Sequence, residues 1–109
     1  MRPLSRFFIA LLSVADAFLG GCRTTENSAP TAQSVWASTR ENNLTTLEHG
    51  RGVFLRSCAE CHTLQPIPNY SVSRWREIIG IMAPRARLNS DDRAALEAYL
   101  LAARRSYPD

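Results

Sequence analysis

The sequence predicts a small all-α fold built from three main helices. Three stretches in the C-terminal part of the chain place apolar residues three and four positions apart, which is the spacing of an amphipathic helix. No stretch shows the alternating or β-branched pattern that a sheet requires. The folded domain is expected to span residues 44–109, and an apolar core of that size gives only marginal stability by itself.

Residues 1–21 resemble a secretory signal peptide. Two arginines precede an apolar run from Phe7 that is shorter than the roughly 20 residues of a membrane span, and small residues follow it. The ending Leu19-Gly20-Gly21-Cys22 resembles the lipobox of bacterial lipoproteins, in which the cysteine becomes the acylated mature N-terminus; Asp16 departs from that pattern. We expect export with Cys22 as the lipidated residue, the alternative being a spectator thiol in an ordinary signal peptide.

Residues 22–43 are expected to form a flexible tether between membrane and domain. They are mainly Thr, Ser, Asn, Ala and Pro with scattered charges, and Trp36 is their one large apolar side chain. Such a stretch buries too little apolar surface to offset the entropy lost on ordering. Trp36 is interpreted either as an interfacial or docking residue or, more simply, as a stray aromatic residue on the tether.

The first helix of the domain is predicted from Leu44 to Ser57. Its apolar stripe consists of Leu44, Leu47, Gly50 or Arg51, and Phe54. A loop over residues 65–70, which contains two prolines, separates it from the second helix.

The second helix is predicted over residues 73–82, with Pro84 ending it. Its stripe consists of Trp75, Ile78, Ile79 and Met82. The third helix is predicted to begin at the capping sequence Asn89-Ser90-Asp91-Asp92 and to end near Arg104-Arg105, so that the charges at both ends complement the helix dipole. Its stripe consists of Leu96, Tyr99, Leu100 and Ala103.

The segment Cys58-Ala59-Glu60-Cys61-His62 has the C-x-x-C-H pattern of c-type haem attachment. Two thiols three positions apart can add to the two vinyl groups of one haem and leave His62 as the proximal iron ligand. A redox dithiol expects a surrounding βαβ pattern, which this chain lacks, and a closed zinc site needs four nitrogen or sulfur ligands, for which only Cys22 and His49 remain.

We therefore predict one covalently bound haem c, held by Cys58, Cys61 and His62, which would supply the missing part of the core; the alternative is a chance motif whose cysteines only pack. A carbonyl in the loop 65–70 is expected to accept the second imidazole N–H of His62.

Residues 44–109 resemble a small class I cytochrome c. The resemblance rests on Gly50 and Phe54 at the family's spacing before the haem motif, on the stretch 75–82, and on Tyr99-Leu100 in a C-terminal helix. It implies that the first and last helices cross closely beside the haem, with Gly50 allowing the contact. It also implies that the second helix carries a distal methionine, although the separation from His62 is shorter than in longer members of the family.

Met82 is the expected distal ligand. A thioether is a soft ligand suited to haem iron, and a Met/His pair raises the reduction potential. Elimination favours this residue, because Met1 leaves with the signal peptide, His49 precedes the haem motif and no histidine follows His62. The alternative is that Met82 only continues the apolar stripe as a gap-filling side chain.

These features favour an electron carrier over an enzyme. We expect a protein on the periplasmic or extracytoplasmic side of a bacterial membrane, exchanging single electrons between a dehydrogenase or quinol-oxidising complex and an oxidase or reductase, or acting as a subunit of such a complex. The net charge of +3 is too small to indicate nucleic-acid binding. The alternative is a five-coordinate haem protein that binds a small ligand, as a sensor or peroxidase-like enzyme.

Four arginines lie near Met82 in the sequence and are expected on a solvated surface, some of them in a docking rim for an acidic partner. They are Arg74, Arg76, Arg85 and Arg87.

Overall fold

The computed structural model describes residues 29–109, and every regular element in that range is helical, which confirms the all-α prediction. The α-helices are α1 (Ala32–Thr39), α2 (Leu44–Ser57), α3 (Val72–Arg85) and α4 (Ser90–Arg105). Two short 3-10 helices, η2 (Cys58–Glu60) and η3 (Ile67–Asn69), lie between α2 and α3. Among these described residues, no helix is both long enough and apolar enough to cross a membrane.

Each α-helix begins at a side-chain cap. A side-chain oxygen accepts a hydrogen bond from the backbone N–H three residues later, at 2.7–3.2 Å, which satisfies one of the free donors of the first turn. The four caps are Thr31, Asn43, Ser71 and Asn89. The cap at Asn89 and the bounds of α2 agree with the sequence prediction.

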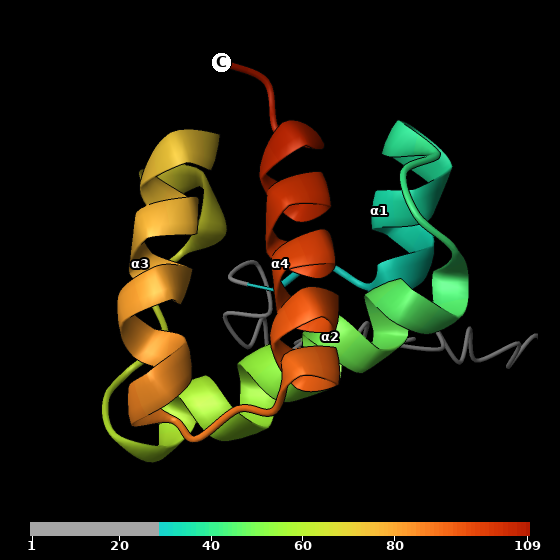
Figure 1. Ribbon diagram of the computed structural model, residues 1–109. Helices are drawn as coiled ribbons and strands as arrows, with labels where there is room; N and C mark the ends of the chain where they lie inside the picture. The colour runs from blue at the N-terminus through green and yellow to red at the C-terminus, as the bar shows by residue number, and fades with distance from the viewer. Residues whose placement is uncertain (1–28) are drawn as a thin grey trace, which may run out of the picture.

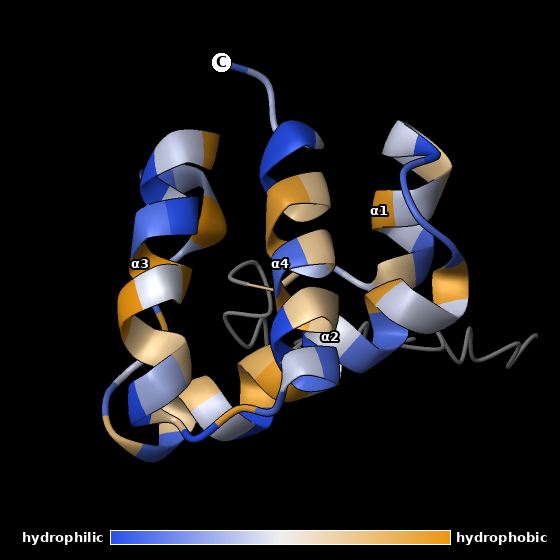
Figure 2. Ribbon diagram, in the orientation of Figure 1, coloured by the Kyte–Doolittle hydropathy of each residue, from blue (hydrophilic) through white to orange (hydrophobic). Residues whose placement is uncertain are grey.

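Helix α4 is the centre of the fold (Figure 1). It packs against all three other α-helices, with α1 and α3 on opposite sides of it and α2 crossing beneath. Its inward side chains are almost completely buried, Tyr99 and Leu100 among them. Hydrophobic and hydrophilic bands alternate along α3 and α4 (Figure 2), as expected for helices that bury one face.

Helices α2 and α4 approach each other closely at Gly50. A Cβ atom at this position would lie 1.9 Å from the carbonyl oxygen of Ala95 and 2.6 Å from the Cβ of Tyr99. Only a residue without a side chain fits there. The crossing of the first and last helices of the predicted domain at Gly50 and Tyr99 is therefore present.

Helix α1 departs from the flexible tether expected over residues 22–43. Ala29, Ala32 and Val35 are at most 5% exposed and belong to the main core. The Tyr99 hydroxyl donates to the Pro30 carbonyl at 2.7 Å, and the Arg51 guanidinium donates to the carbonyls of Ala29 and Pro30. The folded domain therefore includes residues 29–43, and among the described residues it contains four α-helices rather than three.

Helix α3 is longer than predicted and contains Pro84 instead of ending before it. Proline lacks the N–H that would bond to the carbonyl of Gly80, but in the last turn this removes only one helical hydrogen bond. The helix ends beyond it in a Schellman motif, in which the Leu88 N–H bonds to the Ala83 carbonyl at 3.0 Å and the Arg87 N–H to the Pro84 carbonyl at 3.1 Å. Arg87 occupies the left-handed position, with φ 55°, that glycine usually fills.

Candidate functional site

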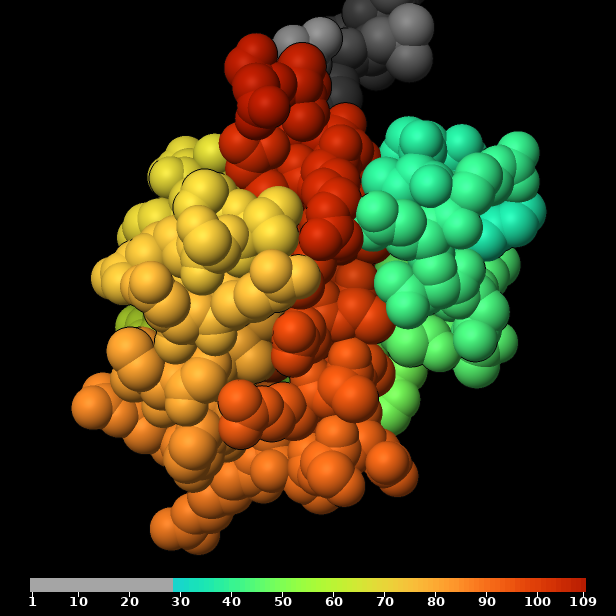
Figure 3. All heavy atoms as spheres, turned by 45° about the horizontal axis from the view of Figure 1, so that its top comes forward, coloured from blue at the N-terminus to red at the C-terminus, as the bar shows by residue number. Residues whose placement is uncertain are grey.

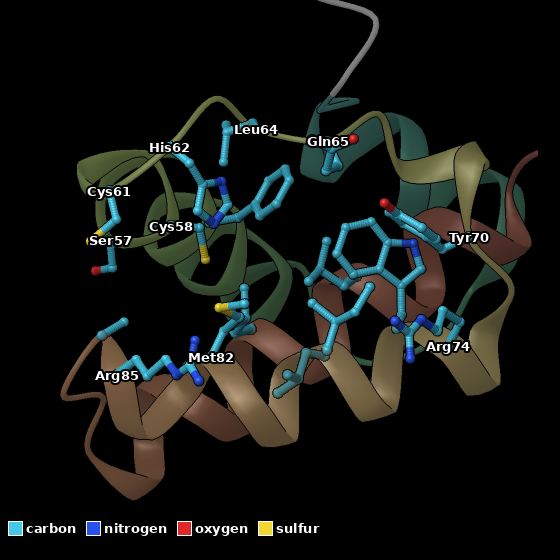
Figure 4. A pocket seen from close by; sticks show the side chains of 17 residues that line it. Ser57, Cys58, Cys61, His62, Leu64, Gln65, Tyr70, Arg74, Met82 and Arg85 are labelled. Carbon is cyan, nitrogen blue, oxygen red and sulfur yellow. The ribbon is translucent and has the colours of Figure 1, made fainter.

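One cavity of about 390 Å³ lies between the end of α2, η2 and the following loop on one side and α3 with α4 on the other. This volume is within the range of roughly 300–1,000 Å³ that is typical of small-molecule and cofactor sites. Most of its wall is apolar or aromatic, and Figure 4 shows it from close by. The apolar part of the wall includes Phe54, Leu64, Trp75, Ile78, Ile79, Leu96 and Leu100.

Cys58 and Cys61 both line this cavity, at the start of η2 and just after it. Cys58 is half-buried, and desolvation raises the pKa of its thiol above the ordinary value of 9.0. Cys61 is exposed, and neither cysteine is in a disulfide. The 3-10 turn between them sets both sulfur atoms at one end of the same cavity (Figure 4).

His62 also lines the cavity, and its ring is held by its neighbour in the chain. The imidazole Nδ1 lies 2.9 Å from the carbonyl oxygen of Thr63. A carbonyl oxygen can only accept, so Nδ1 carries the proton and Nε2 keeps its lone pair. This is the tautomer in which a histidine can bind a metal through Nε2, with the carbonyl orienting the ring.

The prediction that a carbonyl in the loop 65–70 holds His62 is wrong, because the imidazole Nδ1 pairs with the Thr63 carbonyl instead. Two carbonyls of that loop have other partners. The Trp75 indole N–H donates to the Ile67 carbonyl at 2.8 Å, and the Arg104 guanidinium donates to the Tyr70 carbonyl at 2.9 Å. The loop therefore fixes Trp75 in the cavity wall. Tyr70 stacks edge-on against the same indole, with ring centroids 5.4 Å apart.

Met82 lies on α3 and its side chain enters the same cavity. It is half-buried, one turn after the buried Ile79. Figure 4 shows the imidazole of His62 and the side chain of Met82 reaching into the cavity from facing sides, with Cys58 beside them. The four residues predicted as the haem site, which are separated by up to 24 positions in the sequence (82 − 58), thus line one cavity.

Two of the four arginines noted in the sequence also line the cavity. Arg74 lies at the end near Tyr70 and Gln65, and Arg85 lies at the end near the cysteines (Figure 4). Arg74 forms an ion pair with Glu77 at 2.6 Å, whereas Arg76 approaches Glu97 on α4 at 4.0 Å. No carboxylate is among the lining residues, so the cavity carries two cationic groups on an apolar wall.

The residues of the cavity fit a haem better than a bare metal ion. Within residues 29–109, no group of three or more His, Cys, Asp and Glu side chains is arranged to hold a metal ion, as a closed zinc site would need. Two thiols, one imidazole with a free Nε2 and one thioether on an apolar wall are the donors that a covalently attached haem uses. His49 is remote from this cavity and pairs with Asp92 on α4 at 2.7 Å.

The fold and the cavity define the chain as an all-α domain with one apolar, sulfur-lined pocket among its described residues. Comparison with protein-family models, with characterised proteins and with solved structures gives no match. Cys22, the predicted lipidation site, lies outside the described residues.

Sequence reasoning did not anticipate several parts of the wall. Leu64 precedes the predicted loop 65–70 and Gln65 begins it, and no pattern in the sequence marks either side chain as part of the wall. Leu96 and Leu100 were predicted as core residues of the last helix. They are buried in the core and also line the cavity.

Proposed function

We propose that this chain is an exported mono-haem c-type cytochrome that carries single electrons between redox proteins. The observation that carries the proposal is the convergence of Cys58, Cys61, His62 and Met82 on one apolar cavity. The all-α fold, with Gly50 at the crossing of α2 and α4, supports the class I cytochrome c-like architecture that the sequence resemblance implies.

Each residue has a distinct part in holding the group. The thiols of Cys58 and Cys61 can form thioethers with two vinyl groups, which fixes one edge of the haem to η2. The protonated Nδ1 of His62 donates to Thr63, so Nε2 is available as the proximal ligand. Met82 offers a thioether from the opposite wall. A haem held in this way supplies a one-electron iron couple.

The buried apolar part of the cavity wall would shield a bound haem from water on that side and limit reorganisation. Trp75 and Ile79 are at most 3% exposed, and the Trp75 indole is fixed by its hydrogen bond to Ile67. If both His62 and Met82 bind the iron, no coordination position would remain open, so a haem against this apolar wall would favour electron transfer over substrate chemistry. We therefore propose a carrier rather than an enzyme.

Export and anchoring belong to the same proposal. Residues 1–21 act as a signal peptide, and Cys22 becomes the acylated N-terminus on the periplasmic or extracytoplasmic side of a bacterial membrane. The partners are then a dehydrogenase or quinol-oxidising complex as donor and an oxidase or reductase as acceptor. If the chain is instead a subunit of a larger oxidoreductase complex, it would use the same haem site.

The decisive experiment replaces Met82 in the haem-loaded protein. Met82→Leu keeps an apolar side chain of similar size but removes the sulfur, so the oxidised iron should move towards high spin, carbon monoxide should bind the reduced form readily, and the potential should fall. Ile78→Ala is the matched control, because Ile78 lines the same cavity from the same helix and has no donor atom. It should lower stability without changing the spin state.

Three results would count against parts of this proposal. Rapid, complete carbon monoxide binding by the wild-type reduced protein would favour the five-coordinate sensor or peroxidase-like function over the carrier. An oxidised spectrum that is identical in wild type and Met82→Leu would remove Met82 as a ligand. Haem released intact by acidified organic solvent would refute attachment through Cys58 and Cys61.

A further inference from the structure

Helix α1 has two different faces. Ala32 and Val35 point into the core, at 2% and 0% exposure. The outward side is solvent-exposed and carries Gln33, Trp36 and Ala37, at the i, i+3, i+4 spacing of one helix face. Arg40, the left-handed C-cap residue that follows the helix, extends this side, and these four residues are called the outward stripe of α1.

The outward stripe combines an aromatic ring with a cation and contains no carboxylate. Trp36 is 37% exposed, one of three large hydrophobic side chains at the surface of the described residues. The Arg40 guanidinium lies 4.2 Å from the centroid of its ring, a cation–π contact. The nearby Glu41 pairs with Arg105 at 2.9 Å, and Glu48 accepts a hydrogen bond from Gln33 at 3.2 Å.

The direction of this stripe is fixed relative to the cavity. Tyr99 on α4 and Arg51 on α2 hold the carbonyls of Ala29 and Pro30, so α1 moves with the domain. Figure 3 shows α1 and α3 on opposite flanks of α4. The helix that carries Trp36 and the helix that carries Met82 therefore lie on opposite sides of α4.

Because α1 is held against the domain, only a short stretch of chain connects the described residues to the proposed lipid anchor at Cys22. From Cys22 to Ala29 the chain has seven steps (29 − 22 = 7). A fully extended chain covers at most about 3.6 Å per residue, so Ala29 lies within roughly 25 Å of an acylated Cys22. A tether reaching to residue 44 would have allowed roughly three times that distance.

We propose that the outward stripe of α1 lies on the surface of an anionic lipid bilayer. The inference rests on the proposed acylation of Cys22, which brings α1 to the membrane. Trp is enriched at membrane interfaces because its ring is apolar and its N–H is polar, and a guanidinium is attracted to lipid phosphates. The bilayer then holds the domain by α1 and leaves the cavity, on the other side of α4, open to redox partners from the aqueous side.

The test uses the haem-loaded, acylated full chain in vesicles that contain anionic phospholipid and a photoactivatable diazirine phospholipid. After irradiation and digestion, tandem mass spectrometry locates the lipid adducts. Trp36 should carry most of them. Ile81 on α3 is the internal control, because it is also a large hydrophobic side chain and, at 49% exposure, is more accessible than Trp36. A domain that tumbles freely on its anchor would label Ile81 at least as strongly.

Variants sharpen the comparison. The variant Arg40→Gln should lower the labelling of Trp36 about fivefold, because one cation near an anionic surface is lost. Vesicles made of zwitterionic lipid alone should also lower the labelling of Trp36 in the wild-type protein. Leu55→Ala is the matched control variant, since Leu55 is exposed to nearly the same extent, at 36%, but lies on α2. It should leave the labelling of α1 unchanged.

The outcomes separate the two proposals. If the intact mass shows an acylated Cys22 but Trp36 and Ile81 are labelled equally, the anchor stands and the docking of α1 is wrong. If Cys22 carries no acyl group, the proposed lipid anchor is wrong. The unacylated protein is then mixed with the same vesicles and irradiated in the same way. Preferential labelling of Trp36 would then still support the surface, whereas absence of labelling would overturn it as well.

Discussion

Replacing Gly50 by alanine should destabilise the holoprotein, although alanine is the better helix former. The new Cβ would lie 1.9 Å from the Ala95 carbonyl oxygen, whereas ordinary contact begins at 3.4 Å, so α2 and α4 would have to separate by up to about 1.5 Å. The atoms in the way are backbone atoms and the Cβ of Tyr99, which cannot rotate aside. Separation would open the most extensive helix pairing in the domain.

The magnitude follows from two opposing effects. Overpacking of this kind typically costs about 1–3 kcal/mol and occasionally more, and the severe overlap at Gly50 places it at the upper end. The higher intrinsic helix propensity of alanine stabilises the variant by at most about 1 kcal/mol. A net loss of about 2 kcal/mol should lower the midpoint of thermal unfolding by roughly 8–16 °C in a domain of this size.

Gly80→Ala is the matched control. Gly80 is also a helical glycine, but no atom lies within 4 Å of the position its Cβ would take. Alanine there should stabilise α3 by about 0.5–1 kcal/mol. Thermal unfolding of the two holoproteins, followed by circular dichroism, gives the comparison. Equal midpoints for Gly50→Ala and Gly80→Ala would refute the close crossing of α2 and α4.

Three further predictions concern the cofactor, the clamp on α1 and the end of α3. The double change Cys58→Ser and Cys61→Ser should abolish covalent haem and most helical circular dichroism, because so small a core depends on its cofactor; retained helicity would contradict this. Tyr99→Phe removes the hydrogen bond to Pro30 and should lower stability at pH 7 by about 0.5–1.5 kcal/mol in chemical denaturation. Burial raises the pKa of Tyr99 above its ordinary value of 10.0, so the folded state keeps the phenol neutral while the unfolded chain ionises, and wild-type stability should fall above pH 10. The Tyr99→Phe variant has no phenol to ionise, so its stability deficit relative to the wild type should narrow as the pH rises. A difference in unfolding free energy that stays constant with pH would show that Tyr99 is not buried. Arg87→Gly should raise the unfolding midpoint, because glycine adopts the observed φ of 55° without the penalty of about 1 kcal/mol that a side chain brings; a lowered midpoint would mean that the Arg87 side chain stabilises the fold by more than the strain.

The parts of the fold with strong local signals were predictable from the sequence. The apolar stripe of α2 predicted its start at Leu44, and for α4 the stripe and the cap chemistry of Asn89 both predicted the same start. The grouping of Cys58, Cys61, His62 and Met82 followed from donor chemistry. In each case the information is contained in a short segment or in the chemistry of a few residues.

The parts that escaped prediction depend on contacts between distant residues. Helix α1 buries only small side chains, such as Ala32 and Val35, and the groups that hold it are the backbone carbonyls of Ala29 and Pro30. A backbone acceptor leaves no trace in a residue pattern, and its donor Tyr99 is 69 positions away. The partner of His62 is its chain neighbour Thr63, and it was missed for a different reason: any nearby backbone carbonyl satisfies the chemistry, so the sequence does not single one out.

The central place of α4 keeps α1 and α3 on opposite sides of it. Helices α1 and α3 each pack against α4, but no extensive packing joins them to each other. Their inward side chains belong to one core, whereas the exposed side of α1, with Trp36, is not part of it. Free-energy changes at sites without shared neighbours add, so a change on the exposed side of α1 should not alter the strength of an interaction made by Met82 on α3. If the chain is the cytochrome proposed above, its attachment surface could change without a change in redox potential, and selection could adjust the two properties one at a time.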